Sequence, residues 1–328
     1  SGVFAGVRVI VDLRRDSPTT DVVHAPVLLE ESLEALAIQP SGIYLDGTYG
    51  RGGHARALLA RLGSAGRLFG LDRDPDAVAH ARDLMERDSR LIVEQGAFSG
   101  VEEFARRHGI LGTVDGMLLD LGVSSPQLDL PARGFSFSSD GPLDMRMDTR
   151  SGQTAAQWLA GASEAEIAKV LHEYGEERHA RRIARAIVRA RLGSPLRTTA
   201  RLAEIVAASN PSWEQGKHPA TRAFQAIRIQ VNRELDELNA CLHVVCDLLA
   251  AGGRLVVISF HSLEDRIVKR FIRDEARGER FPRGVPVTVR ENRARLRAVG
   301  KPLRPSTQEV ARNPRARSAV MRVAERLR

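Results

Sequence analysis

The sequence is poor in cysteine, in aromatic residues and in long apolar segments. Its two cysteines, Cys241 and Cys246, lie five residues apart in a helical pattern, which fits neither a zinc site nor a disulfide framework. A reducing cytoplasm is therefore the expected location. No run of eighteen apolar residues is present, so we expect no membrane-spanning helix and no membrane partner. The apolar stretch at residues 3–11 is short and lacks a basic leader, so we expect no signal peptide.

Lysine is also scarce, and the basic side chains are unevenly distributed. The 49 basic residues include four lysines, and the formal net charge is +8. From Arg266 onward there are 19 basic against 6 acidic side chains, which leaves 30 against 35 in the preceding part. Because arginine binds phosphates bidentately and stacks on bases, a polyanion is expected as partner, with RNA as the first candidate. No cluster of His, Cys or acidic residues has metal-ligand spacing, so no metal is predicted.

A glycine-rich segment follows the first predicted strand. An apolar run ends in Asp46 and continues into four glycines within seven residues, before a helical pattern at residues 55–62. Glycines allow a sharp turn and the close approach of a ligand to the backbone. A second apolar run delivers Asp72 to the end of a strand, where a carboxylate can accept the two hydroxyl groups of a ribose. The segment therefore predicts a site for an adenosine-containing cofactor.

Two cofactors and a ligand-free turn are open at this point. Gly50, Gly52 and Ala55 fit the relaxed dinucleotide fingerprint, which would make the protein an NAD-dependent oxidoreductase. However, Asp46 and Asp74 would place negative charge near a pyrophosphate. The sulfonium centre of S-adenosylmethionine is cationic and tolerates acids, so these residues favour the methyl donor.

Alternating patterns predict the fold class. Residues 23–130 alternate apolar runs with helical patterns, as a parallel α/β sheet requires. The expected strands are residues 42–46, 67–72, 91–94 and 114–121, with helices near residues 54–62, 75–87 and 100–108. Residues 124–148 lack a helical period and predict a long ordered loop, and loops of that length in compact domains are usually functional.

The second half of the chain begins with helical patterns and returns to the sheet. Helices are expected at residues 154–159, 164–174, 177–191 and 199–209, followed by one long helix over residues 224–249 that stops at Gly252-Gly253. Residues 254–260 predict a buried strand, residues 276–317 a basic loop-like tail, and residues 318–323 a final edge strand. We therefore expect one discontinuous domain (residues 23–130 and 222–328), a helical insertion (residues 131–221) and a weakly ordered N-terminal extension (residues 1–22).

Several motifs together resemble those of one family. They are His24–Glu30 (HAPVLLE), Asp46–His54 (DGTYGRGGH), Leu71–Pro75 (LDRDP), Leu119–Asp129 (LDLGVSSPQLD), Gly134–Phe137 (GFSF), Gly141–Asp148 (GPLDMRMD), His218–Arg222 (HPATR), Ser259–Arg266 (SFHSLEDR) and Asn313–Ser318 (NPRARS). In this order and over nearly the whole chain, they resemble the bacterial MraW/RsmH family of S-adenosylmethionine-dependent methyltransferases. The family modifies N4 of a cytosine in small-subunit ribosomal RNA.

The resemblance implies a fold, a cofactor and a donor site. The fold would be a class I methyltransferase (Rossmann-like) sheet with an inserted all-helical domain for substrate recognition. The cofactor would be S-adenosyl-L-methionine. The residues expected to bind it are Asp46, Gly50, Gly52, Gly53, His54, Asp72, Phe98, Asp120 and Gln127, with Asp72 on the ribose and Phe98 near the adenine. Phe98 as a plain core residue and His54 as a helix cap are the simpler alternatives.

The acceptor site is less defined by the sequence. Many amino-methyltransferases carry an Asp/Asn-Pro-Pro-aromatic tetrad after the fourth strand, whereas this chain has Asp120-Leu-Gly-Val-Ser-Ser-Pro-Gln. We expect Ser124, Ser125, Asp144 and His261 to shape the cytosine pocket. The alternative for His261, with Glu264 and Asp265, is to cap and pair the following helix.

The expected partner is small-subunit ribosomal RNA, methylated within the ribosomal subunit. Arg178, Arg182 and Arg185 lie on the basic face of an amphipathic helix, for which a solvated surface is the alternative. With Arg315 and Arg317 of the tail, they are the predicted RNA-binding residues. A homodimer is left open, and so is a non-catalytic ribosome assembly factor that keeps the fold without the activity.

Overall fold

One seven-stranded sheet forms the centre of the computed structural model, which describes residues 26–210, 218–278 and 294–327. Its strand order is β3-β2-β1-β4-β5-β7-β6. Neighbouring strands are parallel except at β7, which is antiparallel to both β5 and β6. The strands are β1 (Ile43–Asp46), β2 (Arg67–Asp72), β3 (Leu91–Gln95), β4 (Val114–Asp120), β5 (Leu249–Ser259), β6 (Leu296–Ala298) and β7 (Val320–Arg326). The predicted α/β fold with a mostly parallel sheet is confirmed.

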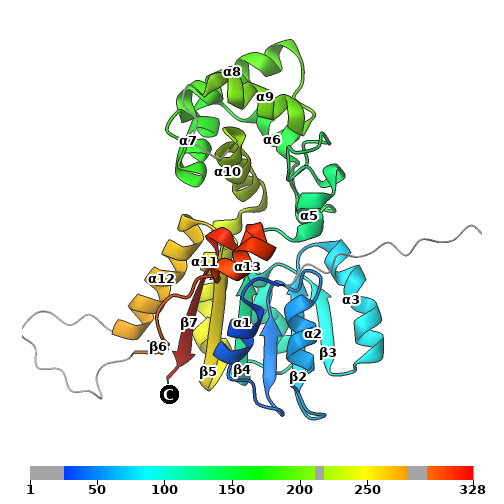
Figure 1. Cartoon of the computed structure of the whole chain (residues 1–328), viewed down its shortest axis with the longest axis vertical. Helices are drawn as coiled ribbons and strands as arrows, with labels where there is room; N and C mark the ends of the chain where they lie inside the picture. The colour runs from blue at the N-terminus through cyan, green and yellow to red at the C-terminus, as the bar shows by residue number, and fades with distance from the viewer. Residues whose placement is uncertain (1–25, 211–217, 279–293, 328) are drawn as a thin grey trace, which may run out of the picture.

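Helices cover both faces of the sheet (Figure 1). One core cluster includes residues of α4 (Val101–Arg107), α11 (Glu234–Leu248) and α12 (Ser262–Arg277). The other includes residues of α1 (Leu29–Ala35), α2 (Gly53–Leu59) and α3 (Pro75–Arg87). Consecutive residues of β1 point to different clusters: Leu45 belongs to the first cluster and Tyr44 to the second. Because side chains alternate along a strand, a strand buried on both faces is mostly apolar, as β1 and the second half of β4 are up to their final aspartates.

A second group of helices lies above the carboxyl edge of the sheet (Figure 1). It contains α6 (Ala155–Gly161), α7 (Glu164–Gly175), α8 (Ala180–Gly193), α9 (Thr199–Ser209) and α10 (Ala220–Asn232). Their apolar faces form a separate buried cluster, to which α10 contributes Phe224 and Ile227. The group is inserted between β4 and β5, which are neighbours in the sheet. The helical cluster thus extends through α10 to Asn232, past residue 221.

Three sequence predictions about the elements are wrong. The long helix predicted over residues 224–249 is two helices, because Arg233 adopts the left-handed backbone conformation (φ 52°) between α10 and α11. The apolar residues keep a helical spacing across this break because both helices bury an apolar face: α10 in the helical cluster and α11 against the sheet. Gly252-Gly253 does not end a helix but lies inside β5. The predicted edge strand is β7, an interior strand between β5 and β6.

Short elements occur where loops are predicted. The segment after β4 contains α5 (Ser125–Asp129) and the 3-10 turn η2 (Pro131–Arg133), while η1 (Phe98–Gly100) follows β3. The C-terminal segment contains β6, α13 (Thr307–Arg312) and η3 (Pro314–Ser318). The extension predicted for residues 1–22 lies outside the described residues. Within the described ranges, none of the helices has the length and apolar character needed to cross a membrane.

Candidate functional site

Three aspartates end neighbouring strands at the carboxyl edge of the sheet. Asp46 ends β1, Asp72 ends β2 and Asp120 ends β4. Since β2, β1 and β4 are adjacent and parallel, their last residues lie along one edge. Open α/β sheets bind ligands at this edge. The structure therefore brings together the carboxylates that the sequence assigns to the cofactor.

The glycine-rich loop after β1 is folded onto the end of β2. The Tyr49 amide donates to the Leu71 carbonyl at 3.1 Å, and the Gly50 amide donates to Asp72 Oδ2 at 2.7 Å. Gly52 has a φ of +67°, and a Cβ at this position would lie 2.5 Å from Tyr49 Oη. A side chain is therefore excluded at Gly52 on two grounds, backbone conformation and space. Gly53 is the first residue of α2 and lies against Pro26.

Asp72 fixes this loop and retains capacity for a ligand. Its Oδ1 accepts from the Asp74 amide at 2.8 Å, and its Oδ2 accepts from Gly50. Burial raises the pKa of Asp72 to about 6, although the two amides act in the opposite direction. Each carboxylate oxygen has a second lone pair, so Asp72 can also accept ribose hydroxyl groups.

Asp46 and Asp120 are linked through Thr48. Asp46 is 2% exposed and accepts from the Thr48 amide at 3.0 Å, and burial raises its pKa to about 7. The Asp120 amide donates to Thr48 Oγ1 at 2.7 Å. Burial, with the nearby charges of Asp46 and Glu264, raises the pKa of Asp120 well above its usual range. Its buried Oδ1 has no hydrogen-bond partner among the described residues, which marks it as available to a ligand.

His54 lies against Asp120 and is neutral at pH 7. Its side chain is 6% exposed, and burial lowers its pKa to about 4. Nε2 lies 3.2 Å from the Val27 carbonyl oxygen, which can only accept, so Nε2 carries the proton of the neutral ring. Nδ1 therefore presents a lone pair towards Asp120 Oδ2, at 3.7 Å. His54 contacts the carboxylate edge and makes no side-chain cap of α2.

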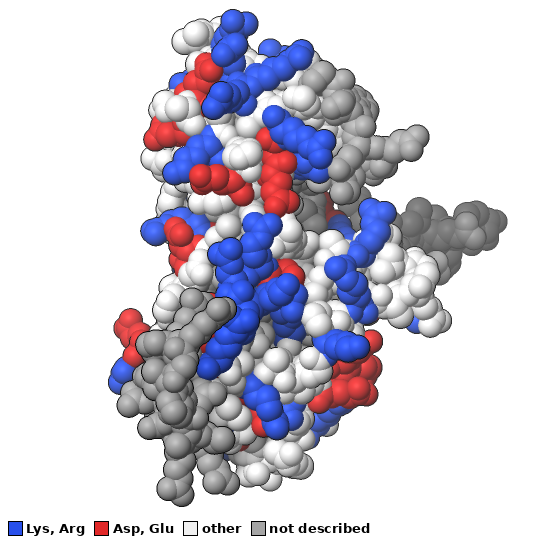
Figure 2. Space-filling view, turned by 90° about the vertical axis from the view of Figure 1, so that its left-hand side faces the viewer, with Lys and Arg blue, Asp and Glu red and all other residues white. Residues whose placement is uncertain are grey.

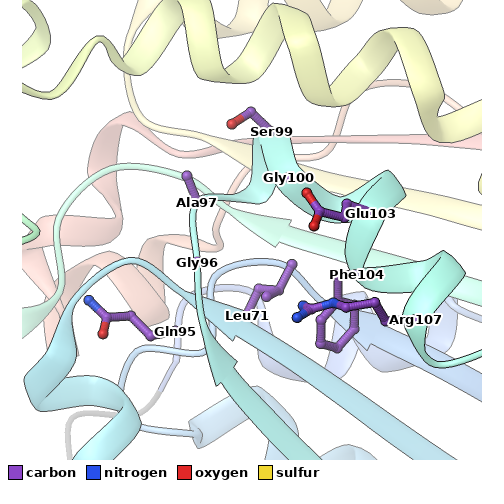
Figure 3. Close-up of a pocket in the computed structure, with 9 residues that line it drawn as sticks. All are labelled: Leu71, Gln95, Gly96, Ala97, Ser99, Gly100, Glu103, Phe104 and Arg107. Carbon is purple, nitrogen blue, oxygen red and sulfur yellow. The ribbon is translucent and has the colours of Figure 1, made fainter.

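A small cavity flanks this edge beside β3. It has a volume of about 230 Å³ and is lined by Leu71, Gln95, Gly96, Ala97, Ser99, Gly100, Glu103, Phe104 and Arg107. Figure 3 shows the Leu71 side chain between Gln95 and Arg107. Phe98 is not part of this lining but is half-buried near the glycine loop, where a Cβ on Gly47 would lie 3.4 Å from its Cβ. Ligand pockets are usually larger, roughly 300–1,000 Å³, so the cavity alone does not hold a nucleoside cofactor.

These residues fit a cationic adenosine ligand. Three carboxylates lie at the edge, one of their buried oxygens lacks a partner, and the glycine loop leaves its backbone uncovered. A pyrophosphate would instead meet Asp46, Asp72 and Asp120 without a compensating cation. The geometry therefore favours a sulfonium nucleoside over a dinucleotide.

The end of β5 brings a histidine and a glutamate to the same edge. Glu264, 3% exposed, accepts from the Phe260 amide at 2.8 Å, and its Oε1 lies 3.1 Å from His261 Nε2. Burial opposes ionisation of Glu264, but His261 and Arg228 outweigh it and lower its pKa. Both ring nitrogens of His261 are buried without an aligned hydrogen bond among the described residues. His261 is thus held beside the Glu264 carboxylate, and its ring nitrogens remain able to form a hydrogen bond with a ligand.

Glu234, at the start of α11, completes this cluster. Ligand atoms of Glu234, His261 and Glu264 all lie within 4.8 Å of one another, so the three side chains could hold a metal ion. Arg228 Nε and Nη2, however, each donate to the Glu234 carboxylate at 2.9 Å. This buried guanidinium already supplies positive charge to the two glutamates.

Gln127 has a structural role in the turn after β4. Its side-chain oxygen accepts from the Ser124 amide at 3.0 Å, and its Nε2 donates to Asp74 Oδ2 at 2.8 Å. Arg133 Nη1 donates to the same Asp74 oxygen at 2.8 Å. Gln127 and Arg133 therefore tie the segment of Ser124 and Ser125 to the loop after β2.

The segment containing Asp144 is fixed from both sides. Asp144 pairs with Arg146 through two hydrogen bonds of 2.8 and 2.9 Å. Asn232 accepts from the Met147 amide at 2.8 Å and donates to the Met145 carbonyl at 2.7 Å. Asn232 of α10 and Arg146 therefore hold the loop that carries Asp144.

The predicted RNA-binding arginines differ in their surroundings. Arg178 and Arg182 are exposed, and neither forms an ion pair with another described residue. Arg185 lies 3.5 Å from Glu164, and Arg315 pairs with Asp129. Arg317 is exposed on η3. Arg178, Arg182 and Arg317 are thus exposed and form no ion pair with another residue in the described part of the chain.

Sequence reasoning missed four polar residues at this site: Arg133, Asn232 and Glu234 are buried, and Arg228 is partly buried. Arg133 directly precedes the Gly134–Phe137 motif, and this position was the one available signal. The other three lie within an apolar helical stripe, where periodicity explains the residues around them. Nothing in the sequence pattern indicates that Arg228 pairs with Glu234 or that Asn232 binds the loop after η2.

Comparison with known proteins gives consistent results. The profile of the family described as the MraW methylase family matches residues 21–327. The chain is 61% identical over 305 residues to the ribosomal RNA small subunit methyltransferase H of Thioalkalivibrio sulfidiphilus, covering 93% of this chain and 97% of that protein. It is 55% identical over 304 residues to the protein of the same name from Nitrosococcus oceani, covering 92% and 96%. An rRNA methylase structure from Streptococcus thermophilus aligns with a TM-score of 0.41 at 11% identity, covering 91% and 95%.

Proposed function

The chain belongs to the MraW methylase family, and on this premise we propose that it methylates the exocyclic N4 amine of one cytosine in small-subunit ribosomal RNA. The methyl donor is S-adenosylmethionine. The observation that carries the proposal is the continuous edge of the sheet on which a carboxylate-rich glycine loop lies next to the His261–Glu264 pair. The first feature suits a cationic donor and the second suits an amine acceptor.

The donor would be held by residues of the carboxylate edge. When bound, S-adenosylmethionine supplies an electrophilic methyl group on a positively charged sulfur. Asp72 would accept the ribose hydroxyls, Phe98 would lie near the adenine, and Gly52 and Gly53 would allow close approach. Asp46 and Asp120 would offset the positive charge, and His54 would line the site beside Asp120. Gln127 would act through its contacts with Ser124 and Asp74.

The acceptor amine needs positioning because its lone pair is delocalised into the cytosine ring. Ionised Glu264 beside His261 Nε2 favours the proton on that nitrogen, so Nδ1 can accept a hydrogen bond from the amine. Such a bond returns electron density to the nucleophile and fixes its direction. Ser124 and Ser125 would contribute hydroxyl and backbone groups, and Asp144 would shape the pocket from the helical side. Positioning of this kind can supply much of the acceleration.

The target base must be unstacked to reach this edge. We propose that the helical part, with Arg178, Arg182 and Arg185, binds the surrounding RNA, together with Arg315 and Arg317. The substrate would be the ribosomal subunit in the cytoplasm, and a homodimer is one assembly state to be measured. Membership of a methylase family removes the NAD-dependent oxidoreductase, while an inactive assembly factor is tested below.

The test is transfer of a tritiated methyl group to small ribosomal subunits and to naked RNA, followed by mapping of the base. We expect incorporation at one cytosine N4, with the donor-site variant Asp72→Ala inactive. His261→Ala should lower kcat about a hundredfold or more with donor affinity retained, and Asp144→Ala should also lower kcat. Unchanged turnover would remove the substituted residue from the mechanism. A wild-type protein that binds subunits without methylating them would instead be an assembly factor.

A further inference from the structure

Helix α12 leads outward from the candidate acceptor site and carries an exposed basic face. We propose that this face, defined here as the α12 track (Arg266, Lys269, Arg270, Arg273 and Arg277), binds the phosphate backbone of the RNA strand that contains the target base. The inference rests on the proposed function, and it assigns a surface to the substrate. All five side chains are exposed.

The track lies on one side of a strongly amphipathic helix. Lys269 and Arg270 are adjacent, and each lies three or four residues from Arg266 and Arg273, so the five side chains cover one broad face, about 16 Å long. The opposite face buries Val268 and Ile272. Packing against the sheet therefore fixes the helix, and the basic side chains do not contribute to the core.

Three members of the α12 track differ from several arginines of the basic C-terminal region in having no ion pair with a described residue. Elsewhere in that region, Arg295 binds Glu275, Arg297 binds Glu325 and Arg322 binds Asp265. By contrast, Lys269, Arg270 and Arg277 form no ion pair with any residue in the described part of the chain. Two members of the track do have acidic partners, since Arg273 pairs with Asp274 at 2.8 Å and Arg266 pairs with Glu176. The charge of the other three is available for a ligand.

The position of α12 connects the track to both parts of the molecule. The helix begins one residue after His261. Its first turn contacts the helical part, because Glu176 at the end of α7 accepts from Ser262 Oγ at 3.1 Å and pairs with Arg266 at 3.2 Å. Figure 2 views the side on which α7 and α12 lie and shows Lys and Arg gathered in a band over the middle of that face. A strand whose base enters at His261 can therefore continue along this band.

Counterion release makes the proposal quantitative. Each phosphate contact on single-stranded RNA contributes about 0.7 to the slope of log affinity against log salt. The variant Lys269→Gln/Arg270→Gln should lower this slope by about 1.4. If the contacts vanish near 1 M salt, affinity should then fall about 14-fold at 0.15 M. The matched control is Arg82→Gln/Arg87→Gln on the exposed face of α3, at the other end of the sheet, which removes the same charge.

The experiment measures binding of a single-stranded RNA oligonucleotide and of small ribosomal subunits between about 0.05 and 0.5 M salt. The track variant should show the smaller slope and a raised KM for subunits, with donor affinity and kcat at saturating substrate unchanged. Equal slopes for the two double variants, or a track variant with normal KM, would overturn the proposal. Absence of methylation by the wild-type protein would instead overturn the proposed function, since RNA binding is measured separately.

Discussion

Replacement of Arg133 by Met should destabilise the protein far more than replacement of an exposed arginine. Arg133 is 8% exposed, pairs with Asp74 at 2.8 Å and donates to the carbonyls of Arg146 and Met147 at 3.1 and 3.0 Å. Its contact with Asp76 is exposed and adds little. Removing one partner of a buried ion pair leaves the other charge uncompensated, at a cost of about 3–5 kcal/mol. We therefore expect a loss of that size in the free energy of unfolding.

Urea denaturation followed by circular dichroism measures this loss, with Arg82→Met on α3 as the control. The control should change the free energy by less than about 0.5 kcal/mol. The double variant Asp74→Asn/Arg133→Met removes both charges while Asn keeps the helix cap, so its loss should fall short of the sum of the single losses by at least about 1 kcal/mol. A loss below about 1 kcal/mol for Arg133→Met, or strict additivity, would refute the reasoning.

Two further predictions concern the donor edge. Burial raises the pKa of Asp46 to about 7 and of Asp72 to about 6, so their contribution to stability is complete below about pH 4 and is lost as pH rises through 6 to 7. A bound cationic donor offsets this loss, and the Tm increase caused by S-adenosylmethionine should grow from about pH 5.5 to about pH 8; a constant increase would contradict these pKa directions. Gly52→Ala should weaken donor binding at least about tenfold, because of the left-handed conformation and the Tyr49 hydroxyl. In Gly161→Ala the added methyl has free space, so calorimetry should show normal donor affinity.

Residues with local chemical signals could be placed from the sequence. Asp46, Asp72 and Asp120 each end an apolar run, and parallel neighbouring strands bring such ends together. The glycine loop was identifiable because closely spaced glycines allow a sharp turn and the close approach of a ligand to the backbone. The bounds of β2 and α3 were predicted to the residue, since Pro75 and the Asp74 cap define the helix start.

Features that depend on long-range contacts could not be predicted. The break at Arg233 was missed because α10 and α11 both bury apolar faces, so periodicity continues across it. Arg228 and Asn232 are polar positions on the same stripe, and their roles arise from partners on α11 and in the loop after η2. The interior place of β7 was missed because strand order is not encoded in the composition of one strand.

The interior place of β7 has a consequence for biosynthesis. Strands β1 to β5 can pair as they leave the ribosome, but β5 keeps an open edge until residues through Arg326 have been made. An unpaired edge of this kind is a site of intermolecular association. A nascent chain interrupted shortly before β7 would therefore hold most of the donor site yet remain prone to aggregation and proteolysis. The open edge of β5 is thus covered, and the sheet completed, only after nearly the whole sequence has been translated.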